Sequence, residues 1–299
     1  MPFIKEPFQI QKPIKLFLFL MKKFDITQRE AQRFIDKGRV YLKGEPILDK
    51  SAIVDKDIEI LYFKPQSKGI KPIFENSDFL IYDKPSGILV HPNCVATPYS
   101  MLDEIRTHGG SEANATHRID METSGLLLAS KHKKAERFLK SSFEHKTIQK
   151  KYLAWVKGKV TQPFEVTKPI KLRNDYSDNK HKVEISENGK YAKTEFKPIK
   201  YNSKFDSTLI ECKPQTGRTH QIRIHLFYSK HPILGDPLYG TSFEVASKYL
   251  EGELSKEERI SQTGAKRLLL HANSLEFKYK NRFYIISKTS FENLEELIF

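Results

Sequence analysis

Apolar residues recur at helical spacing near the start of the chain and predict two short helices. The first is expected over residues 15–23. Its apolar face carries Leu16, Leu20 and Phe24. The second follows Thr27, whose hydroxyl can accept a hydrogen bond from the first turn. Its apolar face carries Ala31, Phe34 and Ile35. Gly38 should end this helix, because glycine readily adopts the left-handed conformation that follows many helices.

Short apolar runs bounded by turn residues predict strands in two groups. Before residue 64 the expected strands are 39–42 and 58–60. Beyond it they are 79–82, 88–91, 126–129, 152–156 and 189–196. Between the groups, residues 64–69 are polar and rich in helix and strand breakers, which indicates a linker. A small module followed by a larger domain fits a chain of 299 residues.

Two later segments differ in how clearly their pattern can be interpreted. Residues 131–143 form an amphipathic pattern that predicts a basic helix, with Ser130 placed to cap it. Residues 221–226 alternate like a strand. They also place Ile222 and Leu226 four residues apart behind Thr219, a possible helix cap. The period alone leaves helix and strand open there.

Charge and composition then narrow the class of protein. Lys and Arg number 51 against 37 Asp and Glu, a formal net charge of +14, which points to a polyanionic partner such as nucleic acid. Hydrophobic residues make up 38%, enough for a packed core, and no apolar run is long enough to span a bilayer, so we expect a soluble protein without a membrane partner. Cys94 and Cys212 stand alone and the start lacks a secretory pattern. We therefore expect no disulfide, no metal site and a cytoplasmic location.

The candidate chemistry lies in residues 117–125, which read H-R-I-D-M-E-T-S-G and lead into the apolar run 126–129. Ser124 and Gly125 suggest a turn into a buried strand, which would place Asp120 on a loop held by a rigid element. Arg118, two residues earlier, can keep the carboxylate ionised. On local physics alone, a structural ion pair that caps a turn is the favoured interpretation.

The wording of this stretch resembles the H-R-[LI]-D-x-x-T-S-G signature of the RluA family of pseudouridine synthases. The resemblance implies that Asp120 is the catalytic nucleophile and that Arg118 fills the gap left by a base flipped out of the RNA. Ile119 replaces the commoner leucine, a volume-conserving change.

Further blocks resemble the same family in the same order. Residues 83–92 read D-K-P-S-G-I-L-V-H-P, residues 150–154 read K-K-Y-L-A, and residues 217–226 read G-R-T-H-Q-I-R-I-H-L. The resemblance implies that Tyr152 stacks on the target base, although a tyrosine on a strand is more often part of the core. It also implies that 221–226 is helical and that Arg223 pairs with Asp120. Residues 267–272 match a further strand of the family.

The front of the chain resembles the alpha-L RNA-binding domain first known from a small-subunit ribosomal protein. The matching words are T-Q-R-E-A at 27–31, I-D-K-G-R-V at 35–40 and V-D-K-D-I at 54–58. We therefore predict an RNA-binding domain over 14–63 with Arg29, Arg33 and Lys37 facing RNA, a linker over 64–71 and the catalytic domain over 72–299. A solvated basic face without a ligand is the alternative.

Together these observations predict an α+β protein: a helix-turn-helix-strand module before a pseudouridine synthase fold with a mixed, largely antiparallel sheet. The expected reaction turns specific uridines of structured RNA into pseudouridine without a cofactor. Large-subunit ribosomal RNA is the preferred substrate and transfer RNA the alternative. Two other classes stay open, a hydrolase that pairs Asp120 with Glu122 and a non-catalytic ribosome-assembly factor. We expect a monomer.

Overall fold

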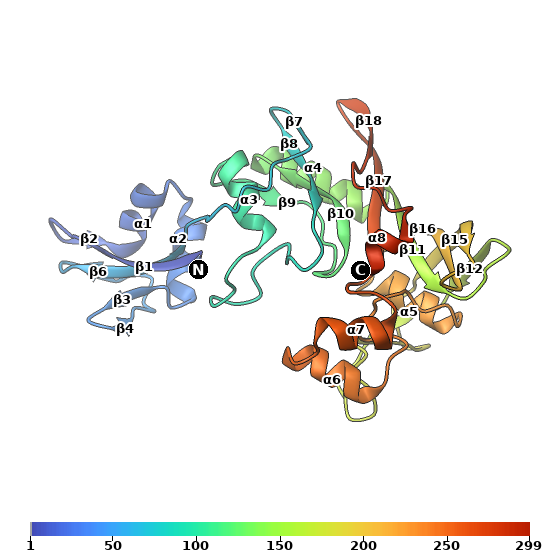
Figure 1. Cartoon of the computed structure of the whole chain (residues 1–299). Helices are drawn as coiled ribbons and strands as arrows, with labels where there is room; N and C mark the ends of the chain where they lie inside the picture. Colours follow the sequence, from blue (N-terminus) through green and yellow to red (C-terminus); the bar gives the residue numbers. More distant parts are fainter. Residues whose placement is uncertain (1) are drawn as a thin grey trace.

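The protein, described here over residues 2–299 by a computed structural model, has an α+β architecture in two parts (Figure 1). Residues 2–63 form the N-terminal module. Its elements are β1 (Phe3–Phe8), β2 (Ile14–Lys15), α1 (Leu16–Phe24), α2 (Gln28–Asp36), β3 (Val40–Leu42), β4 (Glu45–Pro46), β5 (Ile53–Val54) and β6 (Ile58–Phe63). The strands form a sheet of order β1-β6-β3-β4 and a separate β2–β5 pair. Both predicted helices are present, packed on a core of their own.

The ends of α2 follow the predicted chemistry. The Thr27 hydroxyl accepts from the backbone N–H of Glu30, and the Glu30 carboxylate accepts from the backbone N–H of Thr27 at 3.0 Å. This reciprocal capping box satisfies two of the unpaired N–H groups at a helix start. Gly38 follows the helix with φ +59, in the left-handed region, and its N–H donates to Ile35. The local sequence alone therefore fixes both ends of α2.

Strand β1 was not predicted, and the start expected at residue 14 leaves out a strand of the module's sheet. Phe3–Phe8 pairs with β6 in antiparallel register from Phe3↔Phe63 to Phe8↔Ile58. Pro7 interrupts its pattern, and proline lacks the N–H that a central strand needs. The residue is tolerated because β1 is an edge strand of this sheet.

The linker has neither helix nor strand, but it is anchored to the following domain. The N–H of Gln66 donates to Asp103 at 3.0 Å, and the Ser67 hydroxyl and Lys68 N–H donate to Glu104 at 2.6 and 2.5 Å. Both carboxylates belong to residues that are fully buried. A buried carboxylate must be hydrogen-bonded, so the linker supplies donors that the domain requires.

Residues 72–299 form the C-terminal domain around one large sheet. Its strands are β7 (Phe74–Glu75), β8 (Phe79–Lys84), β9 (Asn114–Ala115), β10 (Ser124–Ser130), β11 (Gln149–Lys157), β12 (Phe164–Thr167), β13 (Ile170–Leu172), β14 (Val183–Ile185), β15 (Lys193–Asn202), β16 (Ser207–Pro214), β17 (Leu270–Tyr279) and β18 (Asn281–Ile286). Its helices are α3 (Met101–Gly109), α4 (Lys133–Glu144), α5 (Gln221–Tyr228), α6 (Phe243–Glu251), α7 (Lys256–Thr263) and α8 (Leu294–Ile298).

The sheet has ten strands in the order β12-β15-β16-β11-β17-β10-β8-β7, with β9 beside β10 and β18 beside β17. Within residues 2–299, β10–β17 is its one parallel pair and every other pairing is antiparallel. The predicted mixed, largely antiparallel sheet is confirmed. Strands β13 and β14 form a separate small ribbon.

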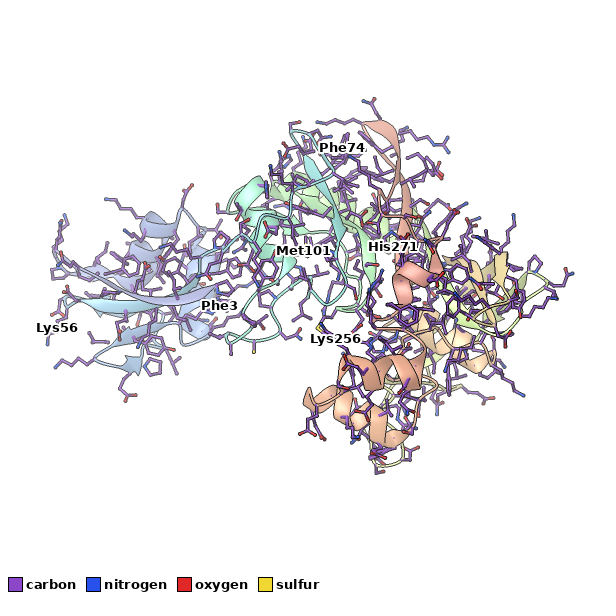
Figure 2. All side chains as sticks on the ribbon, in the orientation of Figure 1. Phe3, Lys56, Phe74, Met101, Lys256 and His271 are labelled. Atoms are coloured by element: carbon purple, nitrogen blue, oxygen red, sulfur yellow. The ribbon has the colours of Figure 1, made fainter. Side chains whose placement is uncertain are left out.

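Strands β8 and β10 are buried on both faces, which explains their continuous apolar runs. Phe79 and Ile81 pack in one core cluster with Leu139 of α4. Leu80 and Ile105, the latter from α3, belong to the cluster on the other face. Figure 2 shows side chains filling the space between the sheet and its helices. The centre of the sheet is therefore the most rigid part of the domain, and the candidate site is built on it.

Three local predictions for this domain were wrong. No strand forms over 88–91, because its carbonyls bond outside any sheet: those of Leu89 and Val90 accept N–H groups from the start of α3. Helix α4 is capped by His132, whose Nδ1 accepts from Ala135, while Ser130 ends β10. Residues 124–125 form no turn, since they are the first residues of β10.

Candidate active site

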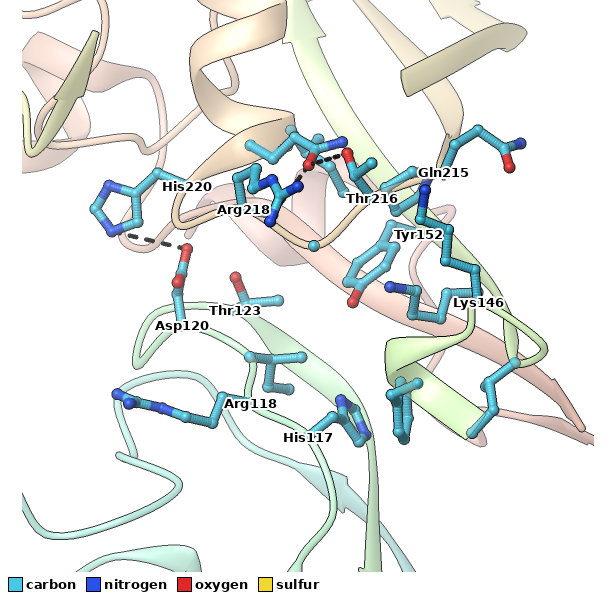
Figure 3. A pocket seen from close by; sticks show the side chains of 18 of the residues that line it. His117, Arg118, Asp120, Thr123, Lys146, Tyr152, Gln215, Thr216, Arg218 and His220 are labelled. Carbon is cyan, nitrogen blue, oxygen red and sulfur yellow. Dashed lines mark hydrogen bonds and ion pairs between the residues drawn. The ribbon is translucent and has the colours of Figure 1, made fainter. Parts of the chain in front are cut away.

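A cavity of about 670 Å³ lies between the loop before β10, strand β11 and the segment that joins β16 to α5 (Figure 3). Asp120, Tyr152 and Arg223 all line it, although they are far apart in the sequence. Small-ligand sites have volumes of several hundred Å³, so this cavity can receive a nucleotide turned out of an RNA.

The loop that carries Asp120 is held from the turn that follows β8. Backbone N–H of Gly87 donates to the carbonyl of Met121 at 2.9 Å, and the Lys84 ammonium donates to the same carbonyl at 2.9 Å. The Ser86 hydroxyl donates to the Glu122 carbonyl at 2.6 Å. Lys84 is buried and also binds two carbonyls of its own turn. One buried cation thus joins this turn to the residue after Asp120.

Glu122 points away from the cavity and completes the anchoring. Its carboxylate accepts from Arg259 of α7 at 2.8 Å and from the Tyr249 hydroxyl of α6 at 2.9 Å. It lies outside the cavity lining and is engaged in a buried ion pair. The geometry therefore provides no carboxylate pair with Asp120, which removes the basis for the hydrolase alternative.

Gly125 allows the strand that follows Asp120 to enter the middle of the sheet. Its φ is +104, and a Cβ at this position would lie 2.3 Å from the carbonyl oxygen of Ala272 on β17. Any side chain would therefore separate the β10–β17 pair. The glycine of the signature serves a close backbone approach.

Arg223 lies next to Asp120, but its main partner is a different carboxylate. Its Nε and Nη2 donate to the two oxygens of Asp236 at 2.8 Å each, and both side chains are buried. Its Nη1 lies 3.7 Å from Asp120 Oδ2. The pairing predicted for Arg223 is therefore wrong in its main partner: a bidentate contact uses the Asp236 fork, and Asp120 receives a longer ionic contact.

This arrangement changes the electrostatics of Asp120. Burial raises its pKa above the ordinary value, the Arg223 charge opposes that rise and the Asp236 charge adds to it. The expectation that Arg223 alone keeps Asp120 ionised is not met, because Asp236 already neutralises most of the arginine's charge. A carboxylate poised in this way can act as a nucleophile or accept a proton.

Tyr152 reaches the cavity from β11 at an irregularity in the sheet. The pairing with β17 shifts between Lys151 and Tyr152, so that Asn273 has no direct partner on β11. Such bulges re-aim side chains. Figure 3 shows the ring directed toward the cavity, where it offers a flat face to a base. Stacking on the target base stays a prediction.

The signature residues before Asp120 divide into an exposed arginine and a buried histidine. Arg118 is exposed, lines the cavity and makes no ion pair within residues 2–299. Nε2 of His117 accepts from the N–H of Leu128 at 3.0 Å, and its ring stacks on Phe143 with centroids 4.4 Å apart. Burial lowers the pKa of His117 to about 3. His117 is therefore a neutral structural group, whereas Arg118 is free to contact RNA.

Basic side chains surround part of the cavity. Four cations that line it, here named the basic rim, make no ion pair in the described part of the chain. They are Lys146, Lys150, Lys213 and Arg218. Arg29, Arg33 and Lys37 are exposed on the module, likewise without ion pairs among residues 2–299, and lie outside the cavity lining.

Sequence reasoning missed two residues of the site, Asp236 and His220. A signal for Asp236 was present, because an acidic residue inside the apolar stretch 233–239 must find a buried partner. His220 occupies the cap position of α5 in place of the predicted Thr219, and its Nε2 lies 3.8 Å from Asp120 Oδ2 (Figure 3). Its proximity to Asp120 depends on the tertiary fold.

Two further features of residues 2–299 concern metals and membranes. These residues contain no group of three or more His, Cys, Asp or Glu side chains arranged to hold a metal ion. None of their helices combines the length and apolar character needed to cross a bilayer.

Comparison with known proteins decides the family. Residues 78–227, which include Asp120, Tyr152 and Arg223, match the family described as RNA pseudouridylate synthase. This chain belongs to that family. A relative from Helicobacter pylori strain J99, named "Uncharacterized RNA pseudouridine synthase", is 39% identical over 288 residues and covers 96% of both chains. The protein is therefore an RNA pseudouridine synthase, an isomerase of the RluA type, and an assembly factor without catalysis is no longer a candidate.

Two other relatives of the synthase are named for different RNAs. "Ribosomal large subunit pseudouridine synthase C" of Pasteurella multocida is 36% identical over 209 residues, covering 69% of this chain and 60% of the relative. "tRNA pseudouridine(32) synthase, mitochondrial" of Saccharomyces cerevisiae is 32% identical over 244 residues, covering 79% and 52%. Human RNA Pseudouridylate Synthase Domain Containing 1 shares the fold, with a TM-score of 0.59, 21% identity and coverage of 76% and 86%.

Proposed function

We propose that this synthase isomerises uridines of large-subunit ribosomal RNA, with Asp120 as the nucleophile. The observation that carries the role of Asp120 is its position: it is the carboxylate in the cavity that is not engaged in a bidentate ion pair, with Arg223 at 3.7 Å. The reaction breaks the bond from N1 to the ribose and forms a bond from C5 to the same ribose carbon. A proton leaves C5 and N1 gains one, so neither oxidant nor cofactor is required.

The cavity can divide this task among its residues. Tyr152 offers a face for the flipped uracil, and stacking of one base on an aromatic ring contributes about 1–3 kcal/mol. Arg118, exposed beside Asp120, can occupy the space that the base leaves in the RNA. The basic rim can bind the phosphates that flank the target nucleotide. Asp120 can then attack the ribose or the uracil, or take a proton from the sugar.

The preference for ribosomal RNA is supported by two observations. The relative from Pasteurella multocida is named for the large ribosomal subunit. In addition, the N-terminal module presents Arg29, Arg33 and Lys37 on one face of α2, exposed and unpaired within residues 2–299, as a module that grips structured RNA requires. Transfer RNA is the second candidate, because the yeast mitochondrial relative is named for it.

The test compares the two RNAs directly. Transcripts of large-subunit ribosomal RNA and of a transfer RNA set, both carrying uridine tritiated at C5, are incubated with the full chain, and tritium release is measured. We expect release from the ribosomal transcript at enzyme concentrations that leave transfer RNA unchanged. Release from transfer RNA alone would overturn the choice of substrate and leave the activity in place. Mapping of pseudouridine in total RNA from cells with and without the gene then locates the target uridines.

A further inference from the structure

His220 is held in an unusual backbone conformation directly beside Asp120. Its φ is +51 and its ψ is 23, in the left-handed region that residues with a Cβ seldom adopt. The conformation turns the imidazole toward the cavity, where Nε2 lies 3.8 Å from Asp120 Oδ2. Strained positions of this kind persist only where the surroundings fix them. The contacts of the His220 ring therefore bear on function.

The other side of the imidazole is fixed by Tyr239. Nδ1 of His220 and the Tyr239 hydroxyl are 2.9 Å apart, and the two rings meet edge to face. Tyr239 is itself buried. Its ring packs against His181 with centroids 4.7 Å apart and lies 5.0 Å from the guanidinium of Arg223. Tyr239 thus links His220 to the arginine that also faces Asp120.

The hydrogen bonds determine which nitrogen of His220 carries the proton. Burial raises the pKa of the Tyr239 hydroxyl, so it keeps its proton, and its oxygen also receives the backbone N–H of Val183. Tyr239 can therefore donate its proton to His220 Nδ1. Burial lowers the pKa of His220 to about 2, with the Arg223 charge adding to the effect, so the imidazole is neutral at physiological pH. A neutral ring that accepts at Nδ1 carries its proton on Nε2, the atom that faces Asp120.

We propose that His220 is a positioning residue for Asp120: its Nε2–H, oriented by the Tyr239 hydroxyl, donates to the carboxylate and holds one oxygen while the other reacts. This inference rests on the role proposed for Asp120. In the free protein the separation of 3.8 Å exceeds a hydrogen bond, and such contacts commonly shorten when the substrate is bound. Arg223 cannot replace this donor, because two of its N–H groups are committed to Asp236.

Two substitutions of His220 separate positioning from structure. In His220→Gln the amide nitrogen can occupy the place of Nε2, so the donor toward Asp120 is retained and the contact with Tyr239 is lost. In His220→Asn the amide reaches only the place of Nδ1, so the contact with Tyr239 is retained and the donor is lost. Asparagine also tolerates the left-handed conformation better than glutamine does. A purely structural role thus favours Asn, and positioning favours Gln.

We expect kcat for tritium release to fall on the order of 100-fold in His220→Asn and to recover most of that loss in His220→Gln, with KM changing less than kcat. Tyr239→Phe keeps the ring and removes the hydroxyl. It should lower kcat in the wild-type background and have little further effect in His220→Ala, because the two residues act in series.

The acid limb of the kcat/KM profile is the readout that a structural role would not move. A donor to the carboxylate favours its charged form, so its removal should shift this limb to higher pH in His220→Asn and not in His220→Gln. The other groups that act on Asp120 are the same in both variants. They are Arg223, Asp236, Lys182, Lys84 and Tyr152.

The outcomes are distinct. Higher kcat in His220→Asn than in His220→Gln, or equal acid limbs in all variants, would overturn the inference. If both variants unfold, the acid limb of Tyr239→Phe decides: an unmoved limb overturns the proposal and a limb at higher pH supports it. Asp120→Asn is measured alongside, and its full activity would refute the role of Asp120 itself. Each variant is assayed on whichever RNA the wild-type chain modifies, so a failed choice of substrate leaves this comparison intact.

Discussion

The substitution Asp236→Asn tests whether the buried pair with Arg223 organises the site. Asp236 Oδ1 accepts from Arg223 and from the N–H groups of Leu238 and Tyr239, and Oδ2 accepts from Arg223 Nε at 2.8 Å. An asparagine can keep the Oδ1 bonds, but it places an amide N–H against Arg223 Nε. The variant loses one charge-assisted bond and leaves a buried arginine whose remaining carboxylate neighbour, Asp120, is 3.7 Å away.

Breaking a buried ion pair from one side costs about 3–5 kcal/mol. At 2–4 °C per kcal/mol for a domain of this size, the midpoint of thermal unfolding should fall by roughly 6–20 °C. Calorimetry measures this, with Glu295→Gln as the matched control. Glu295 forms an ion pair with Lys204 in which both side chains are mostly exposed, so its loss should cost no more than about 1 kcal/mol. A decrease of under 2 °C for Asp236→Asn would refute the reasoning, because it would mean that Arg223 finds an equivalent partner.

Four other outcomes follow from the same geometry. Asp120→Asn should abolish tritium release and leave RNA affinity within a few fold, as measured by filter binding; turnover by the pure variant would contradict the nucleophile. Tyr152→Phe should bind and turn over better than Tyr152→Ala, which loses about 1–3 kcal/mol of stacking; equal values for both would place the ring outside the base contact. The kcat/KM profile should rise with pH through a pKa above the ordinary aspartate value, because burial raises that of Asp120 and the reaction needs its carboxylate; an acid limb below the ordinary value would oppose this. A chain starting at Lys64 should stay folded and lose affinity and salt dependence by about one unit of slope per phosphate contact, measured against the full chain; a start at Gly69 should also lose thermal stability, because Glu104 loses its linker donors.

Local chemistry carried most of what could be predicted from the sequence. Helix α2 followed from one cap residue, one apolar stripe and one glycine, all within twelve residues of each other. The core strands β8 and β10 followed from apolar runs that only burial on both faces explains. The family signature then located Asp120, whose surroundings local physics alone could not distinguish from a structural ion pair.

Tertiary partners explain what the sequence did not reveal. Arg223 has two carboxylates within reach, and only the fold determines that Asp236 takes the bidentate place. Strand β1 depends on an edge position that its own residues do not announce. Residues 88–91 have the pattern of a strand, yet their carbonyls accept N–H groups from α3, an arrangement set by a helix ten residues later. Predictions failed where a hydrogen-bond partner came from another element.

The parallel pairing of β10 with β17 also has a consequence for how the protein folds. Ser124 and His271 meet across this pair although 147 residues separate them in sequence. Closing so long a loop is entropically costly and slows the search for the native pairing. During synthesis, the strand that follows Asp120 must wait for the last tenth of the chain before its outer edge is covered. The emerging polypeptide is therefore catalytically incompetent until its final strands have left the ribosome, and until then an apolar, unpaired β10 edge is open to chaperones.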